Sequence, residues 1–408
     1  MSGQLRVVIA VAGAVGERLA AELRDDGAEI AAVIDPGELA ALPEALPDAD
    51  ALVVTSSREA LTADVVAACD RRGVRVVPLA DDPQQSRWSA AFGLAEALPH
   101  SSEGWRIADA ARRQGRGAAA EPVAGRVIAV WGTHGSPGRS TVAAGLAVEL
   151  ARAGGRVGLI DADAHAPSLA VALGLAEDSP GIAAAARRAA TDTLDAAELT
   201  RISAPLEGTD VEVLTGLNRP SRWPELTADR ISGVLQASRG WVDHVVVDTA
   251  ASLERDEEIV SDLEGPRRNA ATLAALAAAD VVVAVASADP VSIARFLRAH
   301  AELRAHIGPA PVRVVVNRLR GGALGIDARG QIRRTLSRYA GLDDVAFLPH
   351  DPRAADAALL AARPVGDASP RAPLAQGVRR LAKSLARPAE ATADEPRSRR
   401  ERRAARTV

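Results

Sequence analysis

Short runs of apolar residues, many of them β-branched, recur along the chain and alternate with alanine-rich segments of helical character. In the first hundred residues these runs occupy positions 5–12, 28–34, 50–55 and 74–79. Strands that alternate with helices are typical of βαβ units, in which the strands form a parallel sheet. The pattern therefore predicts an α/β domain over residues 1–100.

A second series of strand-like runs starts at residue 125, after a polar segment. Residues 101–124 are rich in glycine, alanine and arginine, which indicates a linker that carries a short helix. We expect residues 125–388 to form a second α/β domain with a mainly parallel sheet flanked by helices. The charged residues 389–408 have no hydrophobic face and are expected to be a disordered tail. After the first strand at 125, further strands are predicted at 156–161, 211–216, 243–248, 280–286, 311–317 and 344–349.

Composition limits the class of protein. The 408 residues are enough for two cores, and with 2% aromatic residues these cores must consist of alanine, valine and leucine. A formal net charge of −4 predicts no overall attraction to nucleic acid or to an anionic membrane. The single cysteine, Cys69, excludes an intramolecular disulfide and is compatible with the cytosol. We expect no secretory signal and no membrane span, because no apolar run approaches about 20 residues.

The first domain has the pattern of a receiver-like, flavodoxin-like fold without the chemistry of a receiver. A phosphoacceptor aspartate would close the third strand, where the sequence has Thr55 and Ser56. The acidic pair expected after the first strand is replaced by AVAGAVG. We therefore interpret this domain as a structural or docking module.

The stretch WGTHGSPGRST, residues 131–141, has the layout of a phosphate-binding loop between a strand and a helix. The common pattern G-x-x-x-x-G-K-[ST] uses its lysine to reach the terminal phosphates. Here Gly138 is followed by Arg139, and Thr133 stands at the first glycine position. Arginine keeps the positive charge and can bind two oxygens, but it need not reach the same point. Because lysine occurs once in the chain, at Lys383, general replacement of lysine by arginine is a second explanation. An ordinary strand–helix turn is the alternative to a nucleotide site.

Acidic residues close two later strands. Asp161 ends an apolar run and Asp163 follows two residues on, while Asp248 ends another run. The carboxyl ends of parallel strands line the ligand crevice of an open α/β sheet. Carboxylates at that edge can hold a metal-bound water and orient an attacking water, so these acids strengthen the prediction of a nucleotide site.

Together, the loop, the D-x-D strand end and the later strand-ending aspartate resemble the deviant Walker family of ParA/MinD-type ATPases over roughly residues 125–388. Within this family the chain is most similar to the CpaE/TadZ branch of tight-adherence (Flp) pilus loci, in its actinobacterial form. That branch combines a receiver-like N-terminal domain lacking a phosphoacceptor with a C-terminal P-loop ATPase domain. The resemblance implies ATP and Mg²⁺ as ligands.

The resemblance also assigns roles to residues of this chain. Asp163 matches the acid that helps to activate water, with Arg139 as the second catalytic group. Mg²⁺ is expected at Ser140, Asp161 and Asp248, partly through water. The nucleotide contacts are expected at Gly135, Ser136, Pro137, Gly138, Arg139, Ser140 and Thr141 for the phosphates, at Asn317 for adenine, and at Pro349 and Asp351 in the loop over the base.

Two cationic positions of the family are altered. His134 stands where the family has the signature lysine that reaches the partner's nucleotide in a dimer, and Arg139 replaces the loop lysine; Ser136 also replaces a glycine. These groups would stabilise the charge that develops in phosphoryl transfer. We therefore expect ATP to bind and hydrolysis to be weak.

The resulting hypothesis is a cytoplasmic, homodimeric ATP-dependent switch that positions or recruits a pilus or secretion assembly, with peripheral membrane association through its partners. A hydrolysis-deficient ATP-bound scaffold and a ParA-like DNA-partitioning ATPase are the alternatives, and a metabolic enzyme of the same fold is a third. DNA is disfavoured because the arginines of one predicted helix do not share a face; these are residues 329, 333, 334 and 338. The acidic run 253–265 follows Asp248 and is either a partner-docking segment or a solvated loop.

Overall fold

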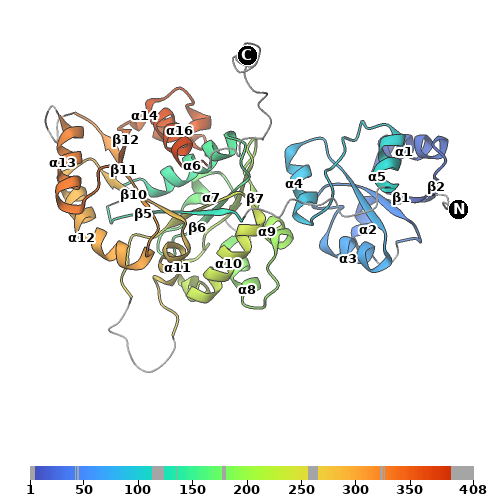
Figure 1. Cartoon of the computed structure of the whole chain (residues 1–408), viewed down its shortest axis with the longest axis horizontal. Helices are drawn as coiled ribbons and strands as arrows, with labels where there is room; N and C mark the ends of the chain where they lie inside the picture. Colours follow the sequence, from blue (N-terminus) through green and yellow to red (C-terminus); the bar gives the residue numbers. More distant parts are fainter. Residues whose placement is uncertain are drawn as a thin grey trace, which may run out of the picture.

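Two sheets follow one another along the chain in the computed structural model (Figure 1). The first has four strands in the order β2-β1-β3-β4, and the second has eight in the order β12-β11-β10-β5-β9-β6-β8-β7. The expected α/β class, with mainly parallel sheets and flanking helices, is confirmed. The structure describes residues 5–41, 43, 46–112, 124–135, 137–176, 181–255, 265–321, 325 and 327–386.

The N-terminal sheet is wholly parallel, and its order matches the first four strands of a flavodoxin-like sheet. At the position of a fifth strand there is an isolated parallel bridge between Leu79 and Leu98. The receiver-like assignment therefore stays a prediction. The strands are β1 (Arg6–Ala10), β2 (Glu29–Val33), β3 (Ala51–Thr55) and β4 (Arg75–Leu79), and the helices are α1 (Gly13–Asp25), α2 (Pro36–Ala41), α3 (Ala63–Arg72), α4 (Pro83–Ala91) and α5 (Gly104–Arg112).

The helix expected within the linker belongs to the N-terminal core. In α5 the residues Ile107, Ala108 and Ala111 are buried and pack with the apolar side chains of α1 and the sheet. Their spacing places them on one face of the helix, which explains why the segment folds back onto the sheet. The ordered N-terminal unit thus extends beyond residue 100.

The C-terminal sheet is parallel apart from β7, which pairs antiparallel with β8 at one edge. Its strands are β5 (Arg126–Gly132), β6 (Val157–Ala162), β7 (Ala204–Pro205), β8 (Val211–Leu214), β9 (His244–Thr249), β10 (Val281–Ser287), β11 (Val312–Leu319) and β12 (Val345–Pro349). The helical elements are α6 (Arg139–Arg152), α7 (Leu169–Ala172), α8 (Gly181–Ala189), α9 (Ala196–Ile202), η2 (Pro220–Glu225), α10 (Ala228–Trp241), α11 (Ala270–Ala278), α12 (Pro290–Ile307), α13 (Ala328–Ala340), α14 (Pro352–Leu360), α15 (Val365–Ala368) and α16 (Pro373–Leu385).

Two apolar cores cover the faces of this sheet. Helices α8, α10, α11 and α12 contribute to one core, and α6, α14 and α16 to the other. Alanine, valine and leucine dominate both, as the composition predicts, and Trp131 of β5 is the largest fully buried side chain. Within the described part of the chain, every helix is too short or too polar to span a bilayer. The predicted tail and most of the acidic run, 256–264, lie outside the described residues.

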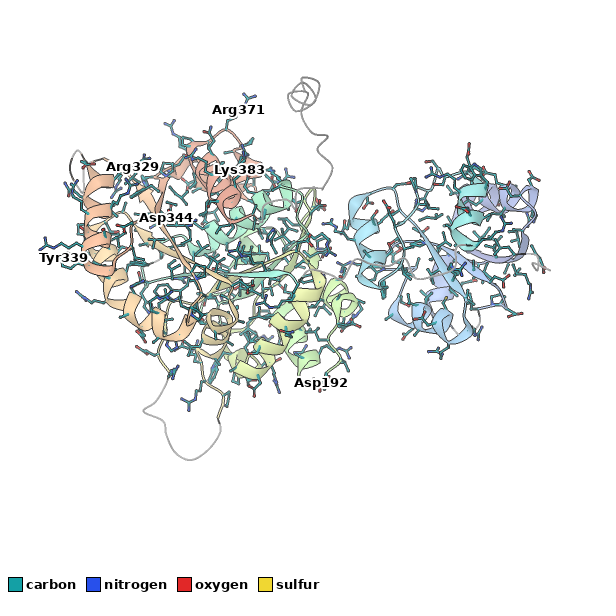
Figure 2. All side chains as sticks on the ribbon, viewed as in Figure 1. Asp192, Arg329, Tyr339, Asp344, Arg371 and Lys383 are labelled. Carbon is teal, nitrogen blue, oxygen red and sulfur yellow. The ribbon has the colours of Figure 1, made fainter. Side chains whose placement is uncertain are left out.

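The arginines of α13 do not form a single stripe. Arg329 and Arg333 lie over the ring of Phe347, whereas Arg338 lies over Tyr339. Figure 2 shows Tyr339 at the outer side of this helix. This arrangement agrees with the prediction that the helix has no continuous basic face.

Side chains of the N-terminal part contact β8, the strand next to the β7 edge of the C-terminal sheet, and α4 lies beside α9 (Figure 1). Arg58, which follows β3, donates to the carbonyl oxygen of Ser203 at 2.9 Å and pairs with Glu212 of β8 at 3.0 Å. Ser203 Oγ also donates to Glu212, at 2.7 Å, and Arg87 pairs with Asp210 at 2.8 Å. The buried Glu212 carboxylate therefore has partners from both parts of the chain.

Candidate nucleotide-binding site

The predicted loop connects the end of β5 to the start of α6. Gly135 and Gly138 have φ angles of +107° and +96°, which L side chains rarely adopt. A Cβ atom on Gly138 would lie 2.6 Å from Nδ2 of Asn317, so close approach also requires glycine there. The N-cap residue of α6 is Gly138, which has no side chain to cap the helix, so the first backbone N–H groups of α6 suit an anion. Ser136 lies outside the described residues.

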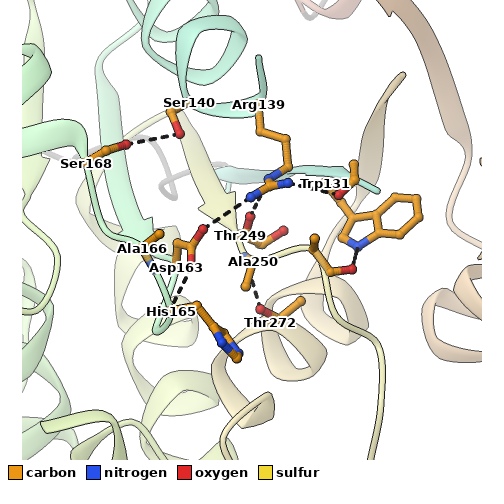
Figure 3. Close-up of polar contacts among 12 residues, drawn as sticks. Trp131, Arg139, Ser140, Asp163, His165, Ala166, Ser168, Thr249, Ala250 and Thr272 are labelled. Carbon is orange, nitrogen blue, oxygen red and sulfur yellow. Dashed lines mark hydrogen bonds and ion pairs between the residues drawn. The ribbon is translucent and has the colours of Figure 1, made fainter. Parts of the chain in front are cut away.

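The Arg139 side chain points from the start of α6 toward Asp163 and Thr249 (Figure 3). Its guanidinium donates to the carbonyl oxygens of Thr249 at 3.0 Å and Gly132 at 3.2 Å. It also pairs with Oδ2 of Asp163 at 3.3 Å, and both side chains are largely buried. The arginine thus connects the loop to the ends of β6 and β9, and Asp163 balances its charge.

Asp248 is a buried carboxylate at the end of β9. Among the described residues, neither of its oxygens has a hydrogen-bond partner of acceptable geometry, although the Ser140 hydroxyl lies close enough to favour the charged form. Burial raises the pKa of Asp248 well above its usual value, and the nearby Asp161 raises it further. Ser140 itself receives a hydrogen bond from Ser168 Oγ at 3.3 Å.

This arrangement fits a Mg²⁺ ion. A buried carboxylate without a partner beside a serine hydroxyl provides hard oxygen ligands, either directly or through water. No three histidine, cysteine, aspartate or glutamate side chains within the described segments form a cluster that could hold a metal. The ion would therefore depend on Ser140 and on phosphate oxygens as well, as is usual for Mg²⁺ at nucleotide sites.

Asp161 lies directly beside Asp248 in the register of β6 and β9. Its carboxylate accepts three backbone hydrogen bonds, from Asp163 at 3.2 Å, Ser168 at 2.9 Å and Leu169 at 3.0 Å. Burial raises its pKa to about 6 despite these bonds. Asp161 therefore orders the loop that carries Asp163, and its expected Mg²⁺ contact stays a prediction.

Both carboxylate oxygens of Asp163, the predicted water-activating acid, have partners in this structure. Its Oδ1 accepts the backbone N–H groups of His165 and Ala166, both at 2.9 Å, and its Oδ2 faces Arg139. The expected role of Asp163 in activating water stays a prediction.

Asn269 connects the loops that follow β6 and β9, a role that the sequence analysis missed. Its Oδ1 lies 2.8 Å from Nε2 of His165, and its Nδ2 donates to Ser252 Oγ at 3.1 Å and to the carbonyl oxygen of Glu254 at 2.9 Å. The side chain is buried. Its one sequence signal is a polar residue next to the alanine-rich run that forms α11.

The residues predicted to contact adenine lie on neighbouring strands, beside the loop. Asn317, near the end of β11, donates through Nδ2 to the carbonyl oxygen of Pro137 at 2.9 Å. Pro349 pairs in register with Leu319 of β11, and Asp351 caps α14 by accepting the N–H of Ala354 at 3.2 Å. In this structure the buried Asn317 side chain holds the loop through Pro137, and its adenine contact stays a prediction.

The remaining loop residues differ in exposure. Thr141 is exposed on α6, and His134 is exposed at the outer side of the loop. Nη1 of Arg295, from α12, lies 3.4 Å from the carbonyl oxygen of His134. Arg295 was not among the predicted site residues, because 161 positions separate it from His134.

Comparison with protein families matches residues 124–205 to the family described as ParA: NUBPL iron-transfer P-loop NTPase. A curated relative, the iron-sulfur cluster carrier protein of Pseudomonas fragi, is 34% identical over 129 residues. The match covers 30% of this chain and 40% of that protein, so the chain spans less than half the length of this relative.

Solved structures share the fold of the C-terminal part. The septum site-determining protein MinD complexed with Mg-ADP, from Pyrococcus horikoshii OT3, has a TM-score of 0.50 at 18% identity, with 64% of this chain and 95% of that chain covered. A ParA family ATPase from Chlorobium tepidum TLS has a TM-score of 0.55 at 17% identity, with 64% and 99% covered. The cell division ATPase MinD of Pyrococcus furiosus has a TM-score of 0.50 at 20% identity, with 64% and 98% covered. At these identities the similarity shows the fold alone.

Proposed function

We propose that the C-terminal part of the chain, a P-loop NTPase of the ParA/MinD type, is an ATP-binding switch with weak ATPase activity. In the ATP-bound state it would form a homodimer and position or recruit a pilus or secretion assembly at the membrane. The observation that carries the proposal is the buried Asp248 carboxylate beside Ser140, which lacks a hydrogen-bond partner among the described residues. A buried charge without a partner is costly unless a ligand completes the site.

The residues around the loop have separate tasks in this proposal. Backbone N–H groups of the loop and of the first turn of α6 bind phosphate oxygens. Ser140 and Asp248 would hold Mg²⁺, which supplies positive charge to the phosphate oxygens. Arg139 exchanges its bond with Asp163 for bonds to phosphate, and the released Asp163 accepts a proton from the attacking water. Asp161 keeps the loop that carries Asp163 in place.

The contact between Arg139 and Asp163 is the reason to expect slow turnover. It occupies both groups that hydrolysis requires, so ATP must compete with a buried ion pair. This observation also favours a second candidate function, a scaffold that binds ATP without hydrolysing it. On the adenine side, Pro349 and Asp351 remain the proposed contacts, and Asn317 would join them only by releasing Pro137.

The pilus assignment rests on the resemblance to the CpaE/TadZ branch. It is supported by the order of the two parts, in which an α/β unit with Thr55 and Ser56 at the expected phosphoacceptor position precedes the P-loop NTPase. We propose that this unit docks partners, and that the protein acts in the cytoplasm or at the inner face of the membrane through them.

Iron-sulfur cluster transfer, the activity named for the Pseudomonas relative, is not proposed for this chain. Clusters are held by several cysteine thiolates, usually four. Cys69 is the one cysteine in the sequence, and burial raises the pKa of its thiol to about 12. A buried protonated thiol is a poor metal ligand.

The test is Mg²⁺-dependent ATP binding and turnover by the purified chain, beside Asp163→Ala and the control Glu302→Ala. Glu302 is an exposed acid on α12, so its loss removes the same charge away from the loop. The switch predicts that wild type and control hydrolyse ATP, and that Asp163→Ala binds ATP but does not hydrolyse it. ATP binding without turnover in all three would favour the scaffold, and absence of ATP binding in the wild type would overturn both functions.

A further inference from the structure

We infer that Arg295 is a second cation of the nucleotide site and that it binds terminal phosphate oxygens of ATP from the outer side of the loop. This inference rests on the proposed ATP binding. It assigns a binding role to a residue of α12, far along the chain from the loop.

Arg139 can bind phosphate only by giving up its bond with Asp163, so a cation on another side of the loop would supplement it. A guanidinium has five N–H groups. Those of Arg139 are directed to Thr249, Gly132, Thr133 and Asp163 through four contacts of 3.0–3.5 Å. In this structure its charge is therefore balanced by Asp163, and its remaining contacts are to backbone carbonyl oxygens.

Arg295 lies on the side of the loop where the exposed His134 lies, and this is the side called the outer side here. Its Nη1 is 3.4 Å from the carbonyl oxygen of His134 and would be 3.1 Å from a Cβ atom placed on Gly135. The guanidinium thus lies against the two residues that open the glycine turn. A side chain at position 135 would push the guanidinium away by a few tenths of an ångström, whereas the φ of +107° is the main reason for glycine there.

Hydrogen bonds at the start of α12 and a buried residue next to Arg295 set the position of Arg295 relative to the loop. Asp289 caps the helix by accepting the N–H of Ser292 at 2.8 Å, and Ser292 Oγ accepts the N–H of Ser287 at 2.8 Å. One residue beyond Arg295, Phe296 is fully buried, and its ring lies 6.4 Å from that of Trp131 on β5. Because β5 leads directly into the loop, the helix and the loop are held by the same core.

The charge of Arg295 is available for a ligand. The side chain is exposed, and it forms no ion pair with any carboxylate in the described part of the chain. Its one hydrogen bond, at 3.4 Å to a neutral carbonyl oxygen, is long. A phosphate oxygen is a stronger acceptor for a guanidinium than a carbonyl oxygen, so binding would draw the side chain onto the nucleotide.

The experiment compares Arg295→Ala, Arg295→Lys and the control Arg298→Ala, an exposed arginine one turn along the same helix. Affinities for ATP, ADP and AMP are measured with Mg²⁺ by calorimetry, and melting temperatures without nucleotide check the fold. We expect Arg295→Ala to weaken ATP binding about 10-fold or more, ADP binding less and AMP binding little, because charge-assisted bonds to the terminal phosphates are lost. Lysine should restore part of the ATP affinity.

Equal loss of affinity for all three nucleotides would mean that Arg295 only shapes the loop, and this would overturn the inference. Unchanged ATP binding by Arg295→Ala, with a wild type that binds ATP, would overturn it as well and leave the proposed function intact. A wild type that binds no ATP would overturn the proposed function itself.

Discussion

The carboxyl ends of the strands differ sharply between the two parallel sheets. In the N-terminal sheet, β3 ends at Thr55, whose hydroxyl contacts Nε2 of His100 at 3.2 Å. The next residue, Ser56, donates to the carbonyl oxygen of Gln85 and accepts the N–H of Ser89 at 3.1 Å. In the C-terminal sheet, the equivalent edge has two buried aspartates, Asp161 and Asp248, and both oxygens of Asp248 lack a partner among the described residues.

The difference shows that fold and site are separate properties. In both sheets the carboxyl ends of the parallel strands lie along one edge, where open α/β sheets commonly bind ligands. In the N-terminal sheet the polar atoms at β3 are paired within the protein, so packing accounts for them. In the C-terminal sheet the buried Asp248 carboxyl has no hydrogen-bond partner among the described residues, which supports the proposed ligand site.

The largest effect is expected for Asp248→Asn. Removal of the charge should abolish the Mg²⁺ dependence of nucleotide binding, because the proposed metal ligand is lost. At a pH above the raised pKa of Asp248, the same change should stabilise the nucleotide-free protein by about 1–3 kcal/mol, because a buried carboxylate without a hydrogen-bond partner among the described residues is replaced by a neutral amide. Denaturant unfolding and nucleotide titrations with and without Mg²⁺ measure the two effects. If the variant were less stable than the wild type and its nucleotide binding still required Mg²⁺, Asp248 would not be the incomplete group that distinguishes the two sheets.

Glu212 is a second buried acid, and it can be compared with Asp248 because its carboxylate has hydrogen-bond and ion-pair partners. Burial raises its pKa, while Ser203 and Arg58 lower it. A carboxyl whose pKa is raised on folding contributes its full stability below its unfolded pKa, and loses it as the pH rises through the folded value. Arg58→Ala should raise this pKa further, so that between pH 5 and pH 8 the variant loses more stability than the wild type, by about 1–2 kcal/mol.

The free energy of unfolding at the two pH values measures this effect. Glu212→Gln combined with Arg58→Ala is the matched control, since it removes the titrating group and should remove the additional pH dependence. Equal pH dependence in the wild type and Arg58→Ala would mean that the ion pair between the two parts of the chain does not form in solution.

The smallest effect is expected for Ser56→Ala at the N-terminal edge. The variant should lose about 1 kcal/mol of stability, because Ser89 loses its acceptor and Gln85 its donor. ATP affinity and turnover should be unchanged. If nucleotide binding changed in this variant, the N-terminal edge would take part in the site, and the two edges would not differ as described.

The sequence alone was sufficient for the alternation of strands and helices and for the position of the acids at strand ends. Both depend on local patterns: apolar runs form the strands, and Asp161 and Asp248 follow directly from where those runs stop. The same holds for Gly135 and Gly138, since a turn with positive φ requires glycine.

Contacts between distant segments could not be predicted in this way. The direction of the Arg139 side chain depends on the carbonyl oxygen of Thr249 and on Asp163, which other strands supply. Asn269, Arg295 and the pair of Arg58 with Glu212 likewise depend on which helices and edges lie together. In each case the residue is unremarkable in its own segment, and only tertiary packing gives it a partner.

Arginine at position 139 also has a consequence for covalent regulation. Acetylation can neutralise a lysine, so a lysine in a phosphate loop offers cells a way to silence the site. Arg139 cannot be acetylated in this way. In these 408 residues the one lysine side chain is Lys383, exposed on α16 (Figure 2). Acylation of lysine side chains, whether enzymatic or by a labelling reagent, would therefore mark α16 and leave the charge of the loop unchanged.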